Sequence, residues 1–430
     1  MASVIAVRTP ILASRLKILQ ALGVFCGFAA GAWLGGAEAP IKLVQGVISP
    51  ITISLIMVFG VFLARWSIPA LIRGTSFVRK DVAKAPHLVV WGVLAGCMWA
   101  VANTLTIYAI QDVGLSIAFP LWNTNSLLAI FWGFLLFNEL RHAGWRRWTG
   151  VIGGALSMFG GAALLAVASS THALGGRATH GVVAALAAGV LWGTMYVPYR
   201  KAYLTGMNPL SLLTFFTFGE LGTMIVLAIS YRGTKALWHE LVGAHGILFW
   251  LMLGGFIWVI GDLFQQYAAK YVGISRGVPL SNTNQLWGLL WGILVFHELR
   301  RGGHALYAEV IGGSILMTIG AVAIALSSAT KQEHVRWQDA AEREGKKYGV
   351  EQSYVRAGIE GKEFEGGENR RTLLDWFLVA GVIAVFLVLA CMARLPPVDV
   401  SWGWAAAITL AMMTLLGGCM IALWRITRFN

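Results

Sequence analysis

Long apolar runs, each about as long as a bilayer core is thick, divide this chain. A membrane-spanning helix needs about 20 mostly apolar residues, and the sequence contains twelve runs near that length. Only 12% of its residues are charged, against about 25% in soluble domains. This composition excludes a soluble enzyme, a disordered chain and a disulfide scaffold. The predicted spans are 18–37, 47–70, 87–110, 114–137, 149–169, 181–200, 209–230, 246–269, 274–296, 307–329, 374–393 and 401–424.

The net charge of +13 could indicate a nucleic-acid partner, but the placement of the basic residues argues against one. With the N-terminus in the cytoplasm, the loops of the first ten spans carry 15 Lys and Arg inside and 6 outside. This excess follows the positive-inside rule. We therefore expect a lipid bilayer as partner and no nucleic acid. We also expect the first span to be a retained helix, since no good cleavage site follows it.

An internal repeat organises the chain. Residues 114–141 and 273–300 match at 15 of 28 positions without a gap, at an offset of 159. The match includes a polar run that unrelated apolar helices would not share. Each copy contains five spans, and because five is odd the second copy must be inverted in the membrane. Inverted repeats are a common plan for secondary transporters, with the substrate site near the midplane.

These patterns predict an all-α polytopic membrane protein with a ten-helix core and two added helices. The segment after the core holds equal numbers of acidic and basic residues and no recognisable motif, and we expect a flexible or helical cytoplasmic linker there. The predicted parts are a cytoplasmic tail (1–17), a first repeat (18–169), an inverted second repeat (180–329), a polar linker (330–373) and two further spans (374–424).

The strongest motif is Pro-Leu-x-Asn-Thr-Asn, which occurs nearly halfway along two predicted spans. Proline frees a backbone carbonyl, and unpaired amides in hydrocarbon are costly. The motif must therefore face the bundle interior or a wet cavity. Neutral amides suit an uncharged polyhydroxylated ligand, and the alternative is interhelical hydrogen bonding worth about 1 kcal/mol each. Two Asn residues two apart point in different directions, so at most one of each pair lines a cavity. The candidate substrate-binding residues are Asn123, Thr124, Asn125, Asn282, Thr283 and Asn284.

Further polar and aromatic side chains lie deep in the predicted spans. Trp99 and Trp258 occupy equivalent positions in the two repeats. An indole offers a sugar ring an apolar face and an N–H donor, although plain packing is the alternative for any one of them. The amides Asn103, Gln265 and Gln266 complete the predicted substrate site.

Two carboxyl groups break the symmetry between the repeats. Glu220 lies at the centre of its span, where the first repeat has Val61, and Asp262 lies where the first repeat has Asn103. A charged carboxylate at mid-bilayer costs at least about 2.5–3.5 kcal/mol. Because taking up a proton removes that charge, both residues are candidate proton carriers. The alternative is a carboxyl group that a neighbour's hydrogen bond holds neutral.

A second pair of acids, Glu139 and Glu298, ends equivalent spans just before Leu-Arg. We expect both at the membrane surface, capping helices or pairing with Arg141 and Arg300. No HExxH, GxSxG or phosphate-binding Gly-Lys-Ser/Thr pattern occurs in the sequence. We therefore expect no enzyme, no metal site and no organic cofactor, with a proton gradient as the energy source and sodium as the open alternative.

Several short motifs resemble a known family. The run 92–100 with Asn103, the run 114–120 and the triplet 123–125 are similar to the glucose/ribose uptake and rhamnose–proton symporter branch of the drug/metabolite transporter superfamily. The resemblance covers about 18–329. It implies ten core helices, a central site between the halves and sugar movement coupled to protons. The chain departs from the usual core after residue 330.

The predicted function is proton-coupled transport of a neutral sugar, in the inner membrane of a bacterium. An exporter of metabolites or drugs is the second hypothesis. A cation exporter would need an acid within the first span, where Glu38 lies only at the end. A nucleotide-sugar carrier would need a deep Lys or Arg, and none lies at the middle of a predicted span. A membrane sensor with 331–373 as its signalling part is the third.

Overall fold

The structure, a computed structural model, describes residues 2–43, 48–113, 118, 121–141, 144–169, 178–297, 304–327, 331–362, 371–395 and 399–429. These residues form helices and short connections, with no strand among them, so the predicted all-α fold is confirmed. An apolar run folds as a helix because a helix satisfies every backbone polar group within the segment. The helices of 20 residues or more are α1 (Ala2–Gly36), α3 (Pro50–Ile72), α5 (Leu88–Val113), α8 (Trp145–Ser169), α9 (Ala178–Leu204), α10 (Pro209–Arg232), α12 (Leu248–Val272), α15 (His304–Leu326), α18 (Leu373–Met392) and α19 (Trp402–Thr427).

Shorter helices connect or interrupt these long ones. Within the described ranges, nine stretches are long and apolar enough to cross a membrane, and they coincide with nine of the twelve predicted spans. The other three predicted spans contain α8 and the short helices around the two Asn-Thr-Asn motifs. The shorter elements are α2 (Glu38–Lys42), α4 (Ser76–Lys84), α7 (Asn125–Phe137), α11 (Thr234–Gly243), α13 (Ile274–Ser281), α14 (Asn284–Leu290), the π-helix η1 (Trp291–Val295), α16 (Lys331–Lys347) and α17 (Gln352–Ile359).

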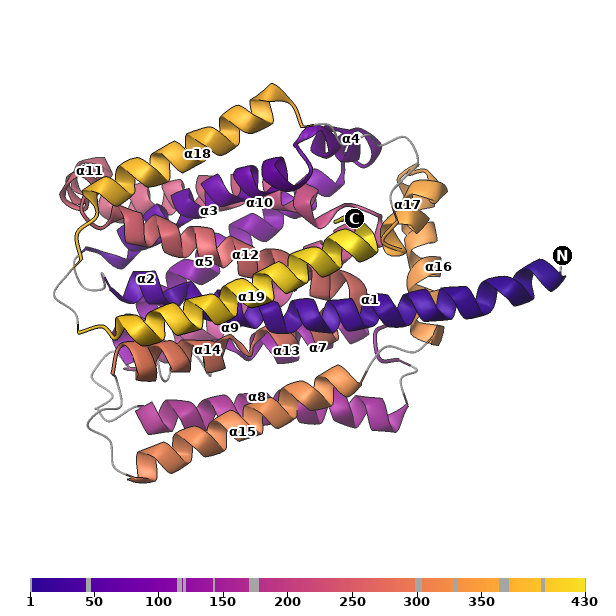
Figure 1. The fold of residues 1–430 in the computed structure, drawn as a ribbon, viewed down its shortest axis with the longest axis horizontal. Helices are drawn as coiled ribbons and strands as arrows, with labels where there is room; N and C mark the ends of the chain where they lie inside the picture. The colour runs from indigo at the N-terminus through magenta and orange to yellow at the C-terminus, as the bar shows by residue number, and fades with distance from the viewer. Residues whose placement is uncertain are drawn as a thin grey trace.

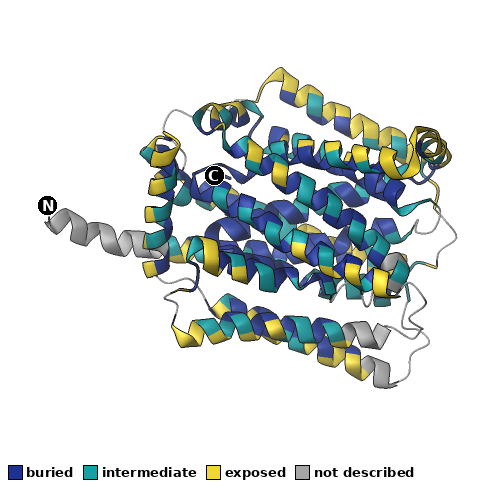
Figure 2. Ribbon diagram, turned by 180° about the vertical axis from the view of Figure 1, so that it is seen from behind, coloured by how far each residue is buried: buried dark blue, intermediate teal, exposed yellow. Residues whose placement is uncertain are grey.

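The long helices lie side by side as one bundle (Figure 1). Helices α8 and α15 form a pair along one edge, α18 runs along the opposite edge, and α16 crosses the ends of the bundle helices at the end nearest the N-terminus. We call this end the α16 end. Buried residues concentrate on the central helices and exposed ones on the outer helices (Figure 2). Apolar outer faces are what a lipid-facing bundle requires.

Two predicted spans are interrupted at the Asn-Thr-Asn motif. We expected continuous spans over 114–137 and 274–296, but α13 ends at Ser281 and α14 begins at Asn284. In the first repeat, a turn at 123–124 precedes α7. The hydroxyls of Thr124 and Thr283 donate to the carbonyls of Leu121 and Leu280 at 2.8 and 2.9 Å. Each threonine thus adds a hydroxyl hydrogen bond to a carbonyl that also accepts a long backbone hydrogen bond, of 3.4 Å, from the same residue. Discontinuous helices of this kind frame the substrate sites of many transporters.

The predicted linker is helical where the structure describes it, and it packs on the bundle. Glu333 of α16 is buried and accepts hydrogen bonds from Arg276 and from the backbone N–H of Leu140. Tyr354 of α17 donates to Asp81 of α4 at 2.6 Å. Burial raises the pKa of Asp81, and the hydrogen bonds from Tyr354 and neighbouring groups oppose that rise. The segment is therefore an integral layer at the α16 end rather than a loose connection.

Helices α18 and α19 lie on the outside of the bundle. Only 17% and 22% of their apolar windows are buried, against 50% or more for the six spans of α1, α3, α5, α9, α10 and α12. The end of α19 nevertheless enters the core. The carbonyl of Phe429 accepts hydrogen bonds from Asn208 at 2.7 Å and from Tyr267 at 2.9 Å. The two added helices thus present apolar faces outward, while the end of α19 is fixed at the α16 end.

Candidate substrate and coupling site

Three charged side chains from three helices meet in the bundle interior. Arg65 of α3 lies between Glu220 of α10 and Asp262 of α12. Its Nε atom is 3.2 Å from Glu220 Oε2, and its Nη2 atom is 3.0 Å from Asp262 Oδ2. All three side chains are fully buried. We call these residues the ion triad.

The presence of Arg65 in the interior corrects a prediction. We expected no deep Lys or Arg, and the loop count placed Arg65 among the cytoplasmic residues. An arginine two turns from the end of a span can extend to the membrane surface, but this one turns inward because two carboxylates lie within its reach. Its guanidinium also lies 4.0 Å from the Phe216 ring centroid and 5.6 Å from that of Trp258. These apolar rings exclude water and strengthen the ion pairs.

The two carboxylates of the triad are not equally satisfied. Besides Arg65, Asp262 accepts hydrogen bonds from Gln266 Nε2 at 2.8 Å and from the Tyr199 hydroxyl at 3.4 Å. Gln266 is held in turn by Tyr203, whose hydroxyl donates to it at 2.5 Å. For Glu220, the described residues supply only the Arg65 guanidinium, and its Oε2 atom forms no hydrogen bond. Hydrogen bonds therefore stabilise the ionised form of Asp262 more than that of Glu220.

The charge of the triad is unbalanced. Two carboxylates share one guanidinium, which leaves one excess negative charge if all three groups are ionised. An uncompensated buried charge is strongly unfavourable. A single proton on one carboxylate would neutralise the cluster.

The two Asn-Thr-Asn motifs meet across the repeats. The Asn282 amide nitrogen donates to Asn125 Oδ1 at 2.9 Å and to Ser126 Oγ at 2.6 Å. These bonds link α7 to the break between α13 and α14. Asn125 and Asn282 thus form the interhelical contact that the sequence left open as an alternative to a binding role.

The remaining two asparagines of the motifs have spare hydrogen-bonding capacity. The Asn123 amide nitrogen and the Asn284 amide oxygen are enclosed yet have no hydrogen-bond partner among the described residues. A buried unpaired amide costs about 1–3 kcal/mol, so a ligand hydroxyl that pairs with it gains that amount. In each motif, therefore, one asparagine is bonded across the repeats and the other keeps an amide atom without a partner among the described residues.

The other predicted site residues lie around these two polar clusters. Gln265 donates to Ser281 Oγ at 2.5 Å, directly before Asn282, so it bridges α12 to the helix break. Asn103 donates to Ser54 at 2.7 Å, and its amide is therefore already occupied in this structure. We call the hydrogen-bonded group of Asn125, Ser126 and Asn282 the asparagine cluster. Gln265 is adjacent to Gln266, and Ser281 is adjacent to Asn282, so these two pairs connect the ion triad to the asparagine cluster.

Trp99 and Trp258 face each other in the interior. Their ring centroids are 4.8 Å apart at an angle of 62°, an edge-to-face arrangement. The indole nitrogen of Trp99 is buried and has no hydrogen-bond partner among the described residues. Since Trp258 also lies near Arg65, the indole pair adjoins the ion triad. It offers an apolar face and an unused donor beside that cluster.

Glu139 lies elsewhere than predicted. It is fully buried rather than at the surface, and it pairs with Arg200 at 3.0 Å instead of Arg141. The capping role is confirmed, because Glu139 accepts hydrogen bonds from the backbone of Ile274 and Ser275 at the start of α13. A carboxylate at a helix N-terminus is stabilised by the helix dipole. The equivalent Glu298 lies outside the described residues.

Several residues of the interior clusters were not singled out by the sequence. Arg65 had a signal, since it lies inside the predicted span 47–70. The tyrosines and serines had none, because a hydroxyl in an apolar span has no distinguishing pattern until its neighbours are known. These residues are Arg65, Ser126, Tyr199, Tyr203 and Ser281.

The fold and the buried polar clusters define a polytopic helical membrane protein with a charged, partly unsatisfied interior. Comparison with known proteins adds the family resemblance. Residues 183–347 match the model of the family described as "Sugar transport protein". The matched range extends beyond 330, where we expected the resemblance to end, and it includes α16.

Curated relatives point the same way. A "Putative sugar uptake protein" of Streptococcus pyogenes serotype M6 is 34% identical over 139 residues, which are 31% of this chain and 45% of that protein. The chain thus spans about half the length of this relative. The "Probable glucose uptake protein GlcU" of Staphylococcus aureus is 23% identical over 273 residues, 59% of this chain and 84% of its own. The predicted resemblance to sugar uptake proteins is confirmed.

A solved crystal structure also aligns with the chain. It covers 70% of this chain and 97% of its own, at 18% sequence identity and a TM-score of 0.44.

Proposed function

We propose that this protein is a secondary transporter that moves a neutral sugar together with a proton, by alternating access between two inverted five-helix repeats. The observation that carries the proposal is the fully buried ion triad of Arg65, Glu220 and Asp262. A structural ion pair needs one acid and one base. The second acid gives the cluster a site for a proton, beside side chains suited to a sugar.

Equivalent helix contacts support the inverted repeat. A Cβ atom at Gly60 of α3 would collide with the carbonyl of Met252 in α12. A Cβ at Gly219 of α10 would collide with the carbonyl of Val93 in α5. Residues 60 and 219, like 93 and 252, are 159 apart. The two close contacts are thus exchanged between the repeats, as a two-fold axis in the membrane plane would require.

The edge pair of helices gives a second example. Gly154 of α8 approaches the backbone of Gly320 in α15, and Gly161 approaches that of Gly313. The offset of 159 relates Gly154 to Gly313 and Gly161 to Gly320, so the two contacts also exchange. Small residues at such positions allow close helix packing in a membrane.

The sugar would bind between the indole pair and the free amides. Trp99 and Trp258 supply an apolar surface for the C–H face of a ring. Asn123 and Asn284 supply an unused donor and an unused acceptor, which match hydroxyl groups. The relatives' names refer to sugar uptake, which favours this class of substrate.

Glu220 would carry the proton. It has fewer hydrogen bonds than Asp262, so protonating Glu220 weakens fewer hydrogen bonds to a carboxylate. With Glu220 neutral, Arg65 and Asp262 remain a balanced pair. Loss of the proton restores the excess charge and biases the bundle toward another arrangement, which is the coupling that symport requires.

In this proposal, buried contacts close the α16 end. Glu139 of the first repeat binds Arg200 and the start of α13, both in the second repeat, and these groups are buried. Glu333 adds a buried ion pair with Arg276. Opening a pathway at this end requires these contacts to separate.

The nucleotide-sugar carrier was set aside because no deep cation was expected, and Arg65 is one. Its charge is nevertheless already compensated by two carboxylates, which would repel an anionic substrate. The triad therefore favours a neutral sugar over an anionic metabolite.

A direct test uses the full chain reconstituted in vesicles. Under an inward proton gradient the protein should accumulate a labelled monosaccharide, and Glu220→Gln should abolish accumulation while keeping exchange of labelled for unlabelled sugar. Asp112→Asn is the matched control, because Asp112 pairs with His180 and not with Arg65. Failure of the unmodified protein to accumulate or exchange any of glucose, ribose or rhamnose would refute sugar transport.

A further inference from the structure

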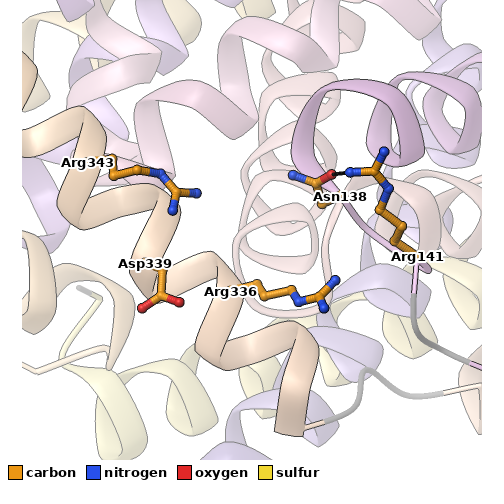
Figure 3. Close-up of a pocket in the computed structure, with 5 residues that line it drawn as sticks. All are labelled: Asn138, Arg141, Arg336, Asp339 and Arg343. Carbon is orange, nitrogen blue, oxygen red and sulfur yellow. Dashed lines mark hydrogen bonds between the residues drawn. The ribbon is translucent and has the colours of Figure 1, made fainter.

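A small cavity lies where α16 crosses the end of α7. Its volume is about 250 Å³, and Figure 3 shows its lining. Arg336 and Arg343 extend from α16 toward Asn138 and Arg141, which follow α7. The fifth lining residue is Asp339. Neither the ion triad nor the asparagine cluster contributes to this cavity.

The cavity has an excess of positive charge. Three arginines and one aspartate line it. Arg141 donates to Asn138 Oδ1 at 2.6 Å, whereas Arg336 and Arg343 have no hydrogen bond or ion pair with any described residue. Other cations nearby are paired, since Arg356 binds Glu342 and Lys201 lies 3.7 Å from Glu344. Arg336 and Arg343 are therefore available to an anion, and Arg343, like Arg141, is exposed to solvent.

We propose that this cavity binds a phosphate group. A guanidinium presents several donors in a fork that matches a tetrahedral oxyanion, and Arg–phosphate hydrogen bonds are among the strongest in proteins. Arg336 and Arg343 are seven residues apart, so they share one face of α16 and approach the cavity from one side while Arg141 approaches from the other. Ligand pockets for whole small molecules run from about 300 to 1,000 Å³. The cavity is therefore sized for one anionic group and its attachment.

Two sources could supply such a group. One is the headgroup of an anionic phospholipid, since basic pockets beside membrane helices bind such headgroups. The other is free phosphate or a soluble phosphate ester. Both use the same arginines, and the experiment below distinguishes them.

Occupation of the cavity would strengthen the closed α16 end. Arg336 lies one turn after Glu333, which binds Arg276 and the Leu140 N–H. Arg141 directly follows Leu140. A phosphate held between Arg336 and Arg141 would therefore tie together the two segments that Glu333 already joins.

The test measures thermal unfolding of the full chain in detergent and in lipid nanodiscs. Inorganic phosphate should raise Tm relative to chloride at equal ionic strength, or phosphatidylglycerol should raise it relative to phosphatidylcholine. The first result identifies a soluble anion and the second a lipid headgroup. The double variant R336Q/R343Q should weaken the effect at least about ten-fold in apparent affinity, because each charged hydrogen bond is worth a factor of about ten or more.

Two variants keep the test decisive. R79Q/K80Q removes two exposed charges from α4 and should leave the stabilisation unchanged. If R336Q/R343Q does not fold, R336K/R343K keeps the charge but loses the fork and should still weaken binding. No stabilisation by either anion, or an equal loss in R79Q/K80Q, would overturn the proposal.

Discussion

At the residue scale, the account depends on one arginine with two acids. The single positive charge of Arg65 is shared between the carboxylates of Glu220 and Asp262. Nearby rings of Phe216 and Trp258 exclude water. The same low polarity that makes the ion pairs strong makes any unpaired charge costly. The triad is therefore sensitive to every change in its charge.

Replacing Arg65 with an uncharged residue should strongly lower the stability of the fold. Arg65→Met leaves two buried carboxylates with no cation and should destabilise the fold by about 3–5 kcal/mol. Thermal unfolding in detergent measures this. Adding Glu220→Gln and Asp262→Asn to the same chain removes both charges and should recover most of the stability. An unchanged Tm for Arg65→Met would show that the triad is not a coupled unit.

Substitution of a bonded asparagine and of an unbonded one should have different effects on stability and on sugar binding. Asn282→Ala removes the bonds to Asn125 and Ser126 and should lower stability by about 0.6–1.7 kcal/mol. Asn123→Ala removes an amide nitrogen without a partner among the described residues, so stability should hold while sugar binding weakens. The measurement is the sugar-induced rise in Tm for each variant. Equal sugar responses in both would contradict the division of roles.

At the element scale, the sequence predicted helices better than their interruptions. Runs such as 209–230 needed only length and apolar content. The break between α13 and α14 depends on where Thr283 and Asn282 find partners, which a linear pattern does not contain. Likewise Arg65 could be placed only once Glu220 and Asp262 were known to surround it. The polar motif itself was predictable because amides at mid-span are costly.

A close helix contact makes Gly219 of α10 sensitive to substitution, unlike Gly222 on the same helix. A Cβ at Gly219 would collide with the Val93 carbonyl, whereas one at Gly222 meets nothing within 4 Å. Gly219→Ala should therefore cost about 1–3 kcal/mol through overpacking. Gly222→Ala, on the same helix, should be neutral or stabilise by up to about 1 kcal/mol. Thermal unfolding compares the two, and equal effects would argue against the close contact.

At the scale of the whole molecule, the added segments pack against both repeats at the α16 end. Glu333 joins α16 to both repeats through Arg276 and Leu140, and Phe429 is held by the core. The packing of the segment after 330 could not be predicted, because charged helices without a motif do not indicate what they pack on. Their contacts indicate that they stabilise one arrangement of the repeats.

Substitutions of Glu333 and Glu342, two acidic residues of α16, should therefore differ sharply in their effect on stability. Glu333→Ala leaves the buried Arg276 without its carboxylate and should cost about 3–5 kcal/mol. Glu342 pairs with exposed Arg356, so Glu342→Ala should cost less than about 1 kcal/mol. Thermal unfolding of the full chain measures both. A small effect at Glu333 would mean that α16 does not hold this end closed.

The central claim is that sugar and proton move together through Glu220. The most direct measurement is the proton flux that sugar evokes in vesicles containing the full chain, followed with a pH-sensitive dye and no imposed gradient. We predict that adding the transported sugar outside acidifies the lumen, and that Glu220→Gln abolishes this signal while Asp112→Asn does not. Sugar entry without acidification, or an unchanged proton signal in Glu220→Gln, would contradict the account.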